Sequence, residues 1–156
     1  MSADWMPREK WEALVSGDRC PLCREIQAGD VEDAYGIKVI DLSFSRLRLS
    51  KNQFVAGYCV LICRKHVREP YELSQKEYRQ FFDDLMQVGK ALEKAFGAIK
   101  MNFEILGNSV PHLHCHIIPR YYGDPRPGVP IDPSSKEVLL DPQEYIHRIE
   151  IIRQLL

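Results

Sequence analysis

Apolar side chains recur at helical spacing in the middle of the chain. Between Ser74 and Gly97 they return every three or four residues, which is the period of a helix that buries one face. Ser74 with Glu77 three residues later forms a capping box, and Gly97 suits a left-handed C-cap. The pattern predicts one long helix whose apolar stripe packs in the core: Tyr78, Phe81, Phe82, Leu85, Val88, Leu92 and Phe96.

Two shorter helices are expected near the ends of the chain. Residues 5–15 predict a short amphipathic helix that leads into the turn "GDRCPLC". Near the C-terminus, Asp141 occupies an N-cap position, followed by Pro142 in the first turn. This second helix carries apolar residues at helical spacing: Ile146, Ile149, Ile152 and Leu156.

Five segments have the composition of β-strands, namely 37–42, 45–49, 58–63, 101–106 and 112–119, and the first two predict a hairpin. The segment "GDPRPGVPIDPSS", residues 123–135, is too rich in Pro and Gly for regular structure. Strands in hairpins, a long helix, further strands and a last helix indicate an α+β fold on a mainly antiparallel sheet. We find no repeat and expect a single domain over 1–156.

Three of the five histidines fall within the stretch "VPHLHCHIIPR", at His112, His114 and His116. In a strand, alternate side chains share one face, so neighbouring histidines stand roughly 6.6 Å apart and the outer two roughly 13 Å. Zinc–nitrogen bonds are about 2.0–2.1 Å long, so one metal ion does not easily hold all three. Three merely structural histidines would each need hydrogen-bond partners in the core. We therefore expect the three imidazoles to have different roles.

Cys20 and Cys23 form a CxxC motif, which is open to three interpretations: half of a zinc site, a redox pair or coincidence. A redox pair normally lies in a thioredoxin-like βαβ unit, and no such unit is evident. Zinc would need two more ligands; His66 and a triad histidine at the end of its strand would complete a tetrahedral site. The remaining strand cysteines, Cys59 and Cys63, are interpreted as small apolar residues.

Composition gives the general setting. The chain has 21 basic and 22 acidic residues, a balance that does not favour a nucleic-acid or membrane partner. The runs "SRLRLSK" and "CRKHVR" are locally basic, but a nucleic-acid surface needs a continuous basic face with aromatics. Neither a signal peptide nor a transmembrane stretch is found. Five cysteines without secretion signals favour reduced thiols or metal ligands, so we expect a cytoplasmic protein.

The histidine stretch is similar to the motif of the histidine triad (HIT) superfamily of nucleotide hydrolases and transferases. "HLHCHII" fits the pattern His-φ-His-φ-His-φ-φ, where φ is apolar. "AGYCVLICRKHV" resembles the family's glycine, strand and "PKRH" segment, "LGNSVPH" its phosphate-loop approach and "IIPRY" the segment after the triad. The resemblance spans residues 20–122. It implies a five-stranded antiparallel sheet with a long helix and a C-terminal helix, usually in a homodimer.

The resemblance also implies roles for individual residues. The middle histidine, His114, would be the nucleophile that attacks the α-phosphorus of a nucleotide and forms a nucleotidyl-imidazole intermediate. His116 would contact the phosphate and stabilise its charge. Asn108 and Ser109 occupy the position of the family's phosphate-binding polar pair. Zinc-containing members imply a structural zinc held by Cys20, Cys23, His66 and His112.

The chain also departs from the family pattern. Many members have a longer glycine-rich loop before the triad, which carries an Asn or Gln that orients the active site. In this chain Asn102 is the candidate for that role. Ser50 falls where some dinucleoside polyphosphate hydrolases place an Asn near the nucleotide. Tyr58 replaces a histidine that follows the glycine in some members. These differences concern the substrate rather than the chemistry.

The function expected from this resemblance is that of a nucleotidyl hydrolase or transferase. It would release a nucleoside monophosphate from a dinucleoside polyphosphate or a related conjugate. A nucleoside phosphoramidase shares the nucleophile and differs in its leaving group. A non-catalytic nucleotide-binding module would bind purine nucleotides without turnover. A zinc-dependent scaffold would lose its function on chelation and show no affinity for nucleotides.

Overall fold

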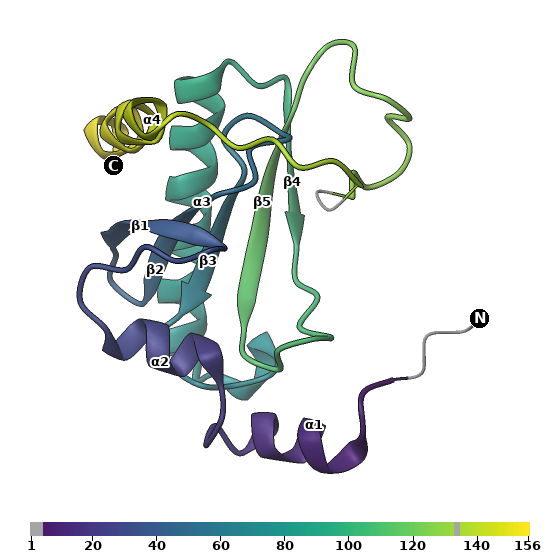
Figure 1. Cartoon of the computed structure of the whole chain (residues 1–156). Helices are drawn as coiled ribbons and strands as arrows, with labels where there is room; N and C mark the ends of the chain where they lie inside the picture. The colour runs from purple at the N-terminus through teal and green to yellow at the C-terminus, as the bar shows by residue number, and fades with distance from the viewer. Residues whose placement is uncertain (1–4, 133–134) are drawn as a thin grey trace.

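The computed structural model describes residues 5–132 and 135–156. Five strands form one sheet in the order β1-β2-β3-β5-β4, and every neighbouring pair is antiparallel (Figure 1). The predicted α+β fold with a five-stranded antiparallel sheet is therefore confirmed. The strands are β1 (Gly36–Asp41), β2 (Ser45–Ser50), β3 (Cys59–Cys63), β4 (Lys100–Glu104) and β5 (His114–Arg120).

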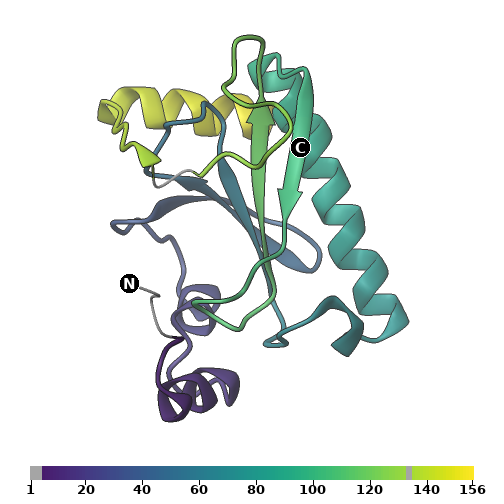
Figure 2. The same cartoon turned by 90° about the vertical axis from the view of Figure 1, so that its right-hand side faces the viewer.

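The longest helix, α3, follows one side of the sheet, while α1 and α2 lie on the other side, near the end where β5 begins (Figure 2). None of the helices in the described part of the chain is long and apolar enough to cross a membrane. The helices are α1 (Arg8–Val15), α2 (Pro21–Gln27), α3 (Gln75–Phe96) and α4 (Pro142–Leu155), with a 3₁₀ turn, η1, at Pro70–Glu72.

The main core lies between the sheet and helices α3 and α4. Alternate strand residues point into it because side chains of a strand alternate between the two faces. Cys59 and Cys63 are fully buried there, which confirms their interpretation as apolar strand residues. A smaller cluster covers the opposite face and joins Leu22 of α2 to Val60, Ile62 and Ile118. The sheet is thus covered by long helices on one face and only partly covered on the other.

The predicted caps of α3 are present. The hydroxyl of Ser74 accepts from the backbone N–H of Glu77 at 3.3 Å, and the Glu77 carboxylate accepts from the backbone N–H of Ser74 at 2.9 Å. Gly97 ends the helix with φ 65°, a conformation that favours glycine. At α4 the expectation was only partly right. Asp141 is at the N-cap position, but its side chain makes no capping hydrogen bond.

Several predicted boundaries were wrong. Helix α1 begins at Arg8 rather than Trp5 because Pro7 has an extended ψ of 139°. Helix α2 was not predicted, since only seven residues separate the turns around it. Strand β4 ends at Glu104, and β5 begins at His114, so His112 precedes the strand. Residues 123–132 contain no helix or strand, as expected, while residues 133–134 lie outside the described part.

Candidate active site and metal centre

His114 and His116 lie on the sheet face opposite α3 and α4. In the register of the sheet, His114 pairs with Ile62 and His116 pairs with Val60, both members of the small cluster on that face. The two imidazole ring centres are 5.1 Å apart and the rings are nearly perpendicular, at 69°. The prediction that alternate histidines share one face is confirmed for this pair.

The imidazole of His114 is held by the backbone. Its Nδ1 lies 2.6 Å from the carbonyl oxygen of His112, and because a carbonyl only accepts, Nδ1 carries the proton. The lone pair is therefore on Nε2, which has no hydrogen-bond partner among the described residues. Burial lowers the pKa of His114, although the hydrogen bond to His112 opposes that shift. The side chain is a neutral imidazole with a free Nε2, which is the form a nucleophile requires.

His116 has a different neighbour. Its Nδ1 lies 2.6 Å from the hydroxyl oxygen of Tyr58, and the two rings are stacked with centroids 6.0 Å apart. Burial, with a smaller contribution from the neighbouring His114 and Arg48, lowers the pKa of His116 to about 4. Glu104 of β4 is the direct register partner of His116. The departure of Tyr58 from the family pattern is one indication of this arrangement in the sequence, but the contact itself was not predicted.

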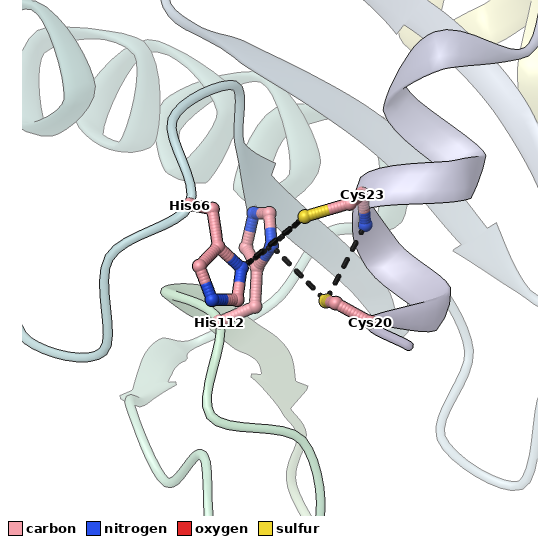
Figure 3. A group of neighbouring side chains, drawn as sticks. All are labelled: Cys20, Cys23, His66 and His112. Carbon is pink, nitrogen blue, oxygen red and sulfur yellow. Dashed lines mark hydrogen bonds between the residues drawn. The ribbon is translucent and has the colours of Figure 1, made fainter. Parts of the chain in front are cut away.

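Four possible metal ligands meet beside the start of β5 (Figure 3). Cys20 is the N-cap residue of α2 and Cys23 lies in its first turn, His66 comes from the loop after β3, and His112 lies two residues before β5. Their ligand atoms all lie within 4.8 Å of one another. The Sγ of Cys23 is 3.2 Å from Nδ1 of His66 and 3.4 Å from Nδ1 of His112. This cluster could bind a metal ion.

The hydrogen bonds of His66 and His112 indicate whether a cation fits between their Nδ1 atoms. Nε2 of His66 donates to the carbonyl of Val15 at 2.8 Å, and Nε2 of His112 donates to the carbonyl of Cys63 at 2.7 Å. Both Nδ1 atoms therefore carry lone pairs, yet they face each other at 3.1 Å. Two lone pairs repel at this distance, and a cation between them removes the repulsion. Backbone carbonyls that accept from the other ring nitrogen, and so fix the tautomer, are typical of metal-bound histidines.

The two thiols agree with this interpretation. The backbone N–H of Cys23 donates to the sulfur of Cys20 at 3.4 Å, so this sulfur is held at the N-terminus of α2. Burial, together with the neighbouring Cys20 sulfur, raises the pKa of the Cys23 thiol to about 12. Two adjacent thiolates are thus unfavourable near neutral pH unless a cation compensates their charge.

The remaining predicted site residues lie at three places. Asn108 and Ser109 are exposed in the loop between β4 and β5, and no hydrogen bond joins them to the triad histidines among the described residues. The Asn102 side-chain oxygen accepts from Nη1 of Arg120 at 3.0 Å. Ser50 is buried at the end of β2, where its backbone N–H donates to the carbonyl of Tyr58.

The site combines two adjacent imidazoles on one strand of a five-stranded antiparallel sheet with a Cys₂His₂ cluster beside the start of that strand. The family model described as HIT domain matches residues 32–123, and the chain belongs to this family. The "Protein hit" of Bacillus subtilis is 31% identical over 109 residues, 67% of this chain and 72% of the relative.

Two further relatives have names that state an activity. A bis(5'-nucleosyl)-tetraphosphatase (asymmetrical) of Schizosaccharomyces pombe is 33% identical over 73 residues, 44% of this chain and 40% of the relative. An adenosine 5'-monophosphoramidase of Saccharomyces cerevisiae is 23% identical over 161 residues, 99% of this chain and 95% of the relative. These two relatives are therefore named for two different activities, that of a tetraphosphatase and that of a phosphoramidase.

Solved structures of the family have the same fold. A histidine triad protein of Sinorhizobium meliloti superposes with a TM-score of 0.71 at 26% identity, over 81% of this chain and 97% of that one. A Zn-bound histidine triad family protein of Mycobacterium smegmatis gives a TM-score of 0.62 at 18% identity, over 88% of this chain and 96% of that one. At the latter identity the likeness concerns the fold alone.

Proposed function

We propose that this protein is a nucleotidyl hydrolase or transferase that acts at the α-phosphate of a dinucleoside polyphosphate or a related nucleotide conjugate. The observation that carries the proposal is the state of His114, a neutral imidazole whose Nδ1–H is held by the His112 carbonyl and whose Nε2 is free. A neutral imidazole is a good nucleophile near pH 7 and a good leaving group once phosphorylated.

The reaction has two displacements at the same phosphorus. Nε2 of His114 first attacks the α-phosphorus; an N–P bond forms while the P–O bond to the leaving group breaks, and the electron pair departs with that oxygen. Water then attacks the phosphorus and loses a proton to solvent. The N–P bond breaks, its electron pair returns to Nε2, and a nucleoside monophosphate is released. A different acceptor in place of water gives a transferase.

The neighbouring polar groups would serve the phosphate rather than the bond-breaking step. His116 is adjacent to His114, with ring centres 5.1 Å apart, so a phosphate bound at His114 Nε2 lies within its reach. Asn108 and Ser109 would supply neutral donors to developing negative charge. Asn102 and Ser50 are proposed to face the rest of the nucleotide, because both sit on strands of the triad-bearing sheet.

We further infer that the metal of the cluster is zinc and that its role is structural. In a tetrahedral zinc site with two sulfur and two nitrogen ligands, ligand atoms are about 3.3–3.8 Å apart. Four of the separations are close to this range, 3.1 Å between the two nitrogens and 3.2–3.4 Å between sulfur and nitrogen, and all four ligand atoms lie within 4.8 Å of one another. Four protein ligands, Cys20, Cys23, His66 and His112, leave no open position for a reacting water.

A phosphoramidase is the second candidate activity. It is supported by the Saccharomyces cerevisiae phosphoramidase, whose likeness extends over 99% of this chain. It would use the same attack by His114, but a P–N bond would break in place of a P–O bond. A non-catalytic nucleotide-binding module is less well supported, because it does not require a free, neutral nucleophile at position 114.

We also propose a cytoplasmic homodimer. All five cysteines are free, which is typical of reducing compartments. The dimer is supported by the family resemblance and by β4, an edge strand of the sheet. Phe103 on this strand is 39% exposed, and Ile99 just before it is 49% exposed. The unpaired backbone groups of an edge strand are a ready pairing surface for a second chain.

The activity is tested by following AMP release from diadenosine polyphosphates and from an adenosine phosphoramidate. Wild type is compared with His114→Ala and with His147→Ala, a control histidine exposed on α4. We expect release by wild type and by the control, and near-complete loss in His114→Ala. The faster substrate distinguishes the hydrolase from the phosphoramidase. Nucleotide binding without AMP release from either substrate would instead support the binding module.

A further inference from the structure

Tyr58 and His116 make one of the shortest side-chain contacts of the site, with the hydroxyl oxygen 2.6 Å from Nδ1. Tyr58 directly precedes β3 and is 7% exposed, so its side chain is largely shielded from water. Its ring is stacked on that of His116 at an angle of 24°. The contact is therefore built into the fold by packing as well as by the hydrogen bond.

The direction of this hydrogen bond follows from the partners. Burial raises the pKa of Tyr58 to about 12, so the phenol keeps its proton near neutral pH. No other acceptor for that proton lies within hydrogen-bond distance among the described residues. If Nδ1 of His116 carried a proton instead, the two hydrogens would compete for one contact and the Tyr58 hydrogen would be unpaired in a buried place.

We propose that Tyr58 is a positioning residue that holds His116 as the Nε2–H tautomer, opposite to the tautomer of the neighbouring His114. His114 donates from Nδ1 to the carbonyl of His112 and so presents a lone pair at Nε2. His116 accepts at Nδ1 from Tyr58 and so presents an N–H at Nε2. Two adjacent imidazoles thus offer complementary groups, one nucleophile and one hydrogen-bond donor.

This inference deepens the proposed function, on which its catalytic part rests. An attacking nitrogen and a donor must act on the same phosphate, since the donor stabilises the charge that grows on the phosphoryl oxygens. The opposite tautomer of His116 would point a second lone pair at an anion. A phenol in this place does not itself take up a proton at low pH, so the donor at His116 does not depend on the charge state of its partner.

The tautomers are measured without substrate, by two-bond ¹H–¹⁵N NMR correlation of the imidazole rings in the full-length protein. The five histidine signals are assigned with single His→Gln variants. We expect the proton of His114 on Nδ1 and that of His116 on Nε2, with Nδ1 of His116 shifted by an accepted hydrogen bond. A wild-type His116 that carries its proton on Nδ1 overturns the proposal, whatever the activity.

Tyr58→Phe keeps the stacked ring and removes only the hydroxyl. In this variant we expect the Nδ1 signal of His116 to move to that of an unbonded nitrogen, while the His114 signals stay in place. Tyr121→Phe is the matched control, because the Tyr121 hydroxyl donates to the carbonyl of Ala56 at 2.6 Å and also packs at the small cluster. An unchanged His116 spectrum in Tyr58→Phe contradicts the proposal.

Kinetics then test the catalytic part. In Tyr58→Phe we expect kcat to fall roughly two- to tenfold, the effect of one hydrogen bond, with KM nearly unchanged. Tyr121→Phe should keep the wild-type kcat. A normal kcat in Tyr58→Phe, together with the altered His116 spectrum, contradicts a role in the chemical step. If wild type releases no AMP, the proposed function fails, whereas the tautomer assignment is still decided by the spectra.

Discussion

The backbone carbonyl of His112 accepts a hydrogen bond from Nδ1 of His114 at 2.6 Å, while the imidazole of His112 faces Cys20, Cys23 and His66. His112 thus contributes its imidazole to the Cys₂His₂ cluster and its backbone carbonyl to the hydrogen bond that holds His114. The orientation of the His114 ring depends on where the His112 backbone lies, and the cluster fixes that backbone at the start of β5. Metal loss should therefore affect catalysis as well as folding.

We predict that Cys23→Ser loses the bound metal, unfolds at a lower temperature and loses roughly tenfold or more in kcat, the range seen when groups that orient a site are removed. Metal content, thermal unfolding and AMP release are measured on the same preparation. Cys59→Ala is the control. It removes a buried thiol outside the cluster and should lose stability through a cavity while retaining the metal.

A Cys23→Ser variant that keeps one metal ion per chain would show that this thiol is not a ligand. Removal of the metal from wild type by a chelator offers an independent comparison. Full activity in metal-free protein would contradict the link through His112.

The stability of the fold should depend on pH through His116. Burial lowers its pKa to about 4, whereas an unfolded histidine titrates near 6.5. As the pH falls from about 6.5 to about 4, the unfolded chain binds a proton at this position that the folded chain does not. The free energy of unfolding should therefore decrease over this window, and denaturant unfolding at several pH values measures the decrease.

His116→Gln isolates that contribution, because glutamine does not titrate and the other groups are unchanged. We expect a shallower loss of stability between about pH 6.5 and pH 4 in this variant than in wild type. Equal pH dependence in the two proteins would mean that His116 does not have the lowered pKa.

A buried carboxylate on α3 should contribute strongly to the stability of the fold. Asp84 is 4% exposed and accepts hydrogen bonds from the hydroxyls of Ser43 and Ser45 and from the backbone N–H of Phe44, at 2.9, 2.6 and 2.8 Å. These bonds join α3 to the β1–β2 hairpin. Hydrogen bonds to charged groups contribute about 1.5–3 kcal/mol each.

We expect Asp84→Ala to lower the free energy of unfolding by about 3 kcal/mol, measured by urea denaturation. The neighbouring Asp83 is exposed, and Asp83→Ala should stay within about 0.5 kcal/mol of wild type. Similar values for the two variants would contradict the role of the three hydrogen bonds.

The sequence predicted the sheet, the long helix and the residues of the cluster because these depend on local patterns. Alternation in "HLHCHII" placed His114 and His116 on one face, and the capping pattern from Ser74 to Gly97 defined α3. The CxxC and "RKH" segments supplied ligands that meet in the structure. The strand prediction was wrong for His112, since its side chain turns toward the cluster and β5 starts only at His114.

The contacts that decide proton positions could not be predicted from the sequence. They join residues distant in the chain, such as Tyr58 and His116, which are 58 residues apart. The carbonyls that fix the rings of His66 and His112 belong to the backbone, and no residue type encodes them. Helix α2 is short and begins with Pro21, so its apolar residues show too little periodicity to identify it.

In the proposed mechanism the reaction passes through a covalent nucleotidyl-His114 intermediate. The most direct measurement is the stereochemistry at phosphorus, with a substrate chiral at an α-phosphorothioate and hydrolysis in ¹⁸O-labelled water. Each in-line displacement inverts the phosphorus. Two displacements, first by Nε2 of His114 and then by water, predict overall retention of configuration. Inversion would mean a single attack by water and would rule out the covalent intermediate.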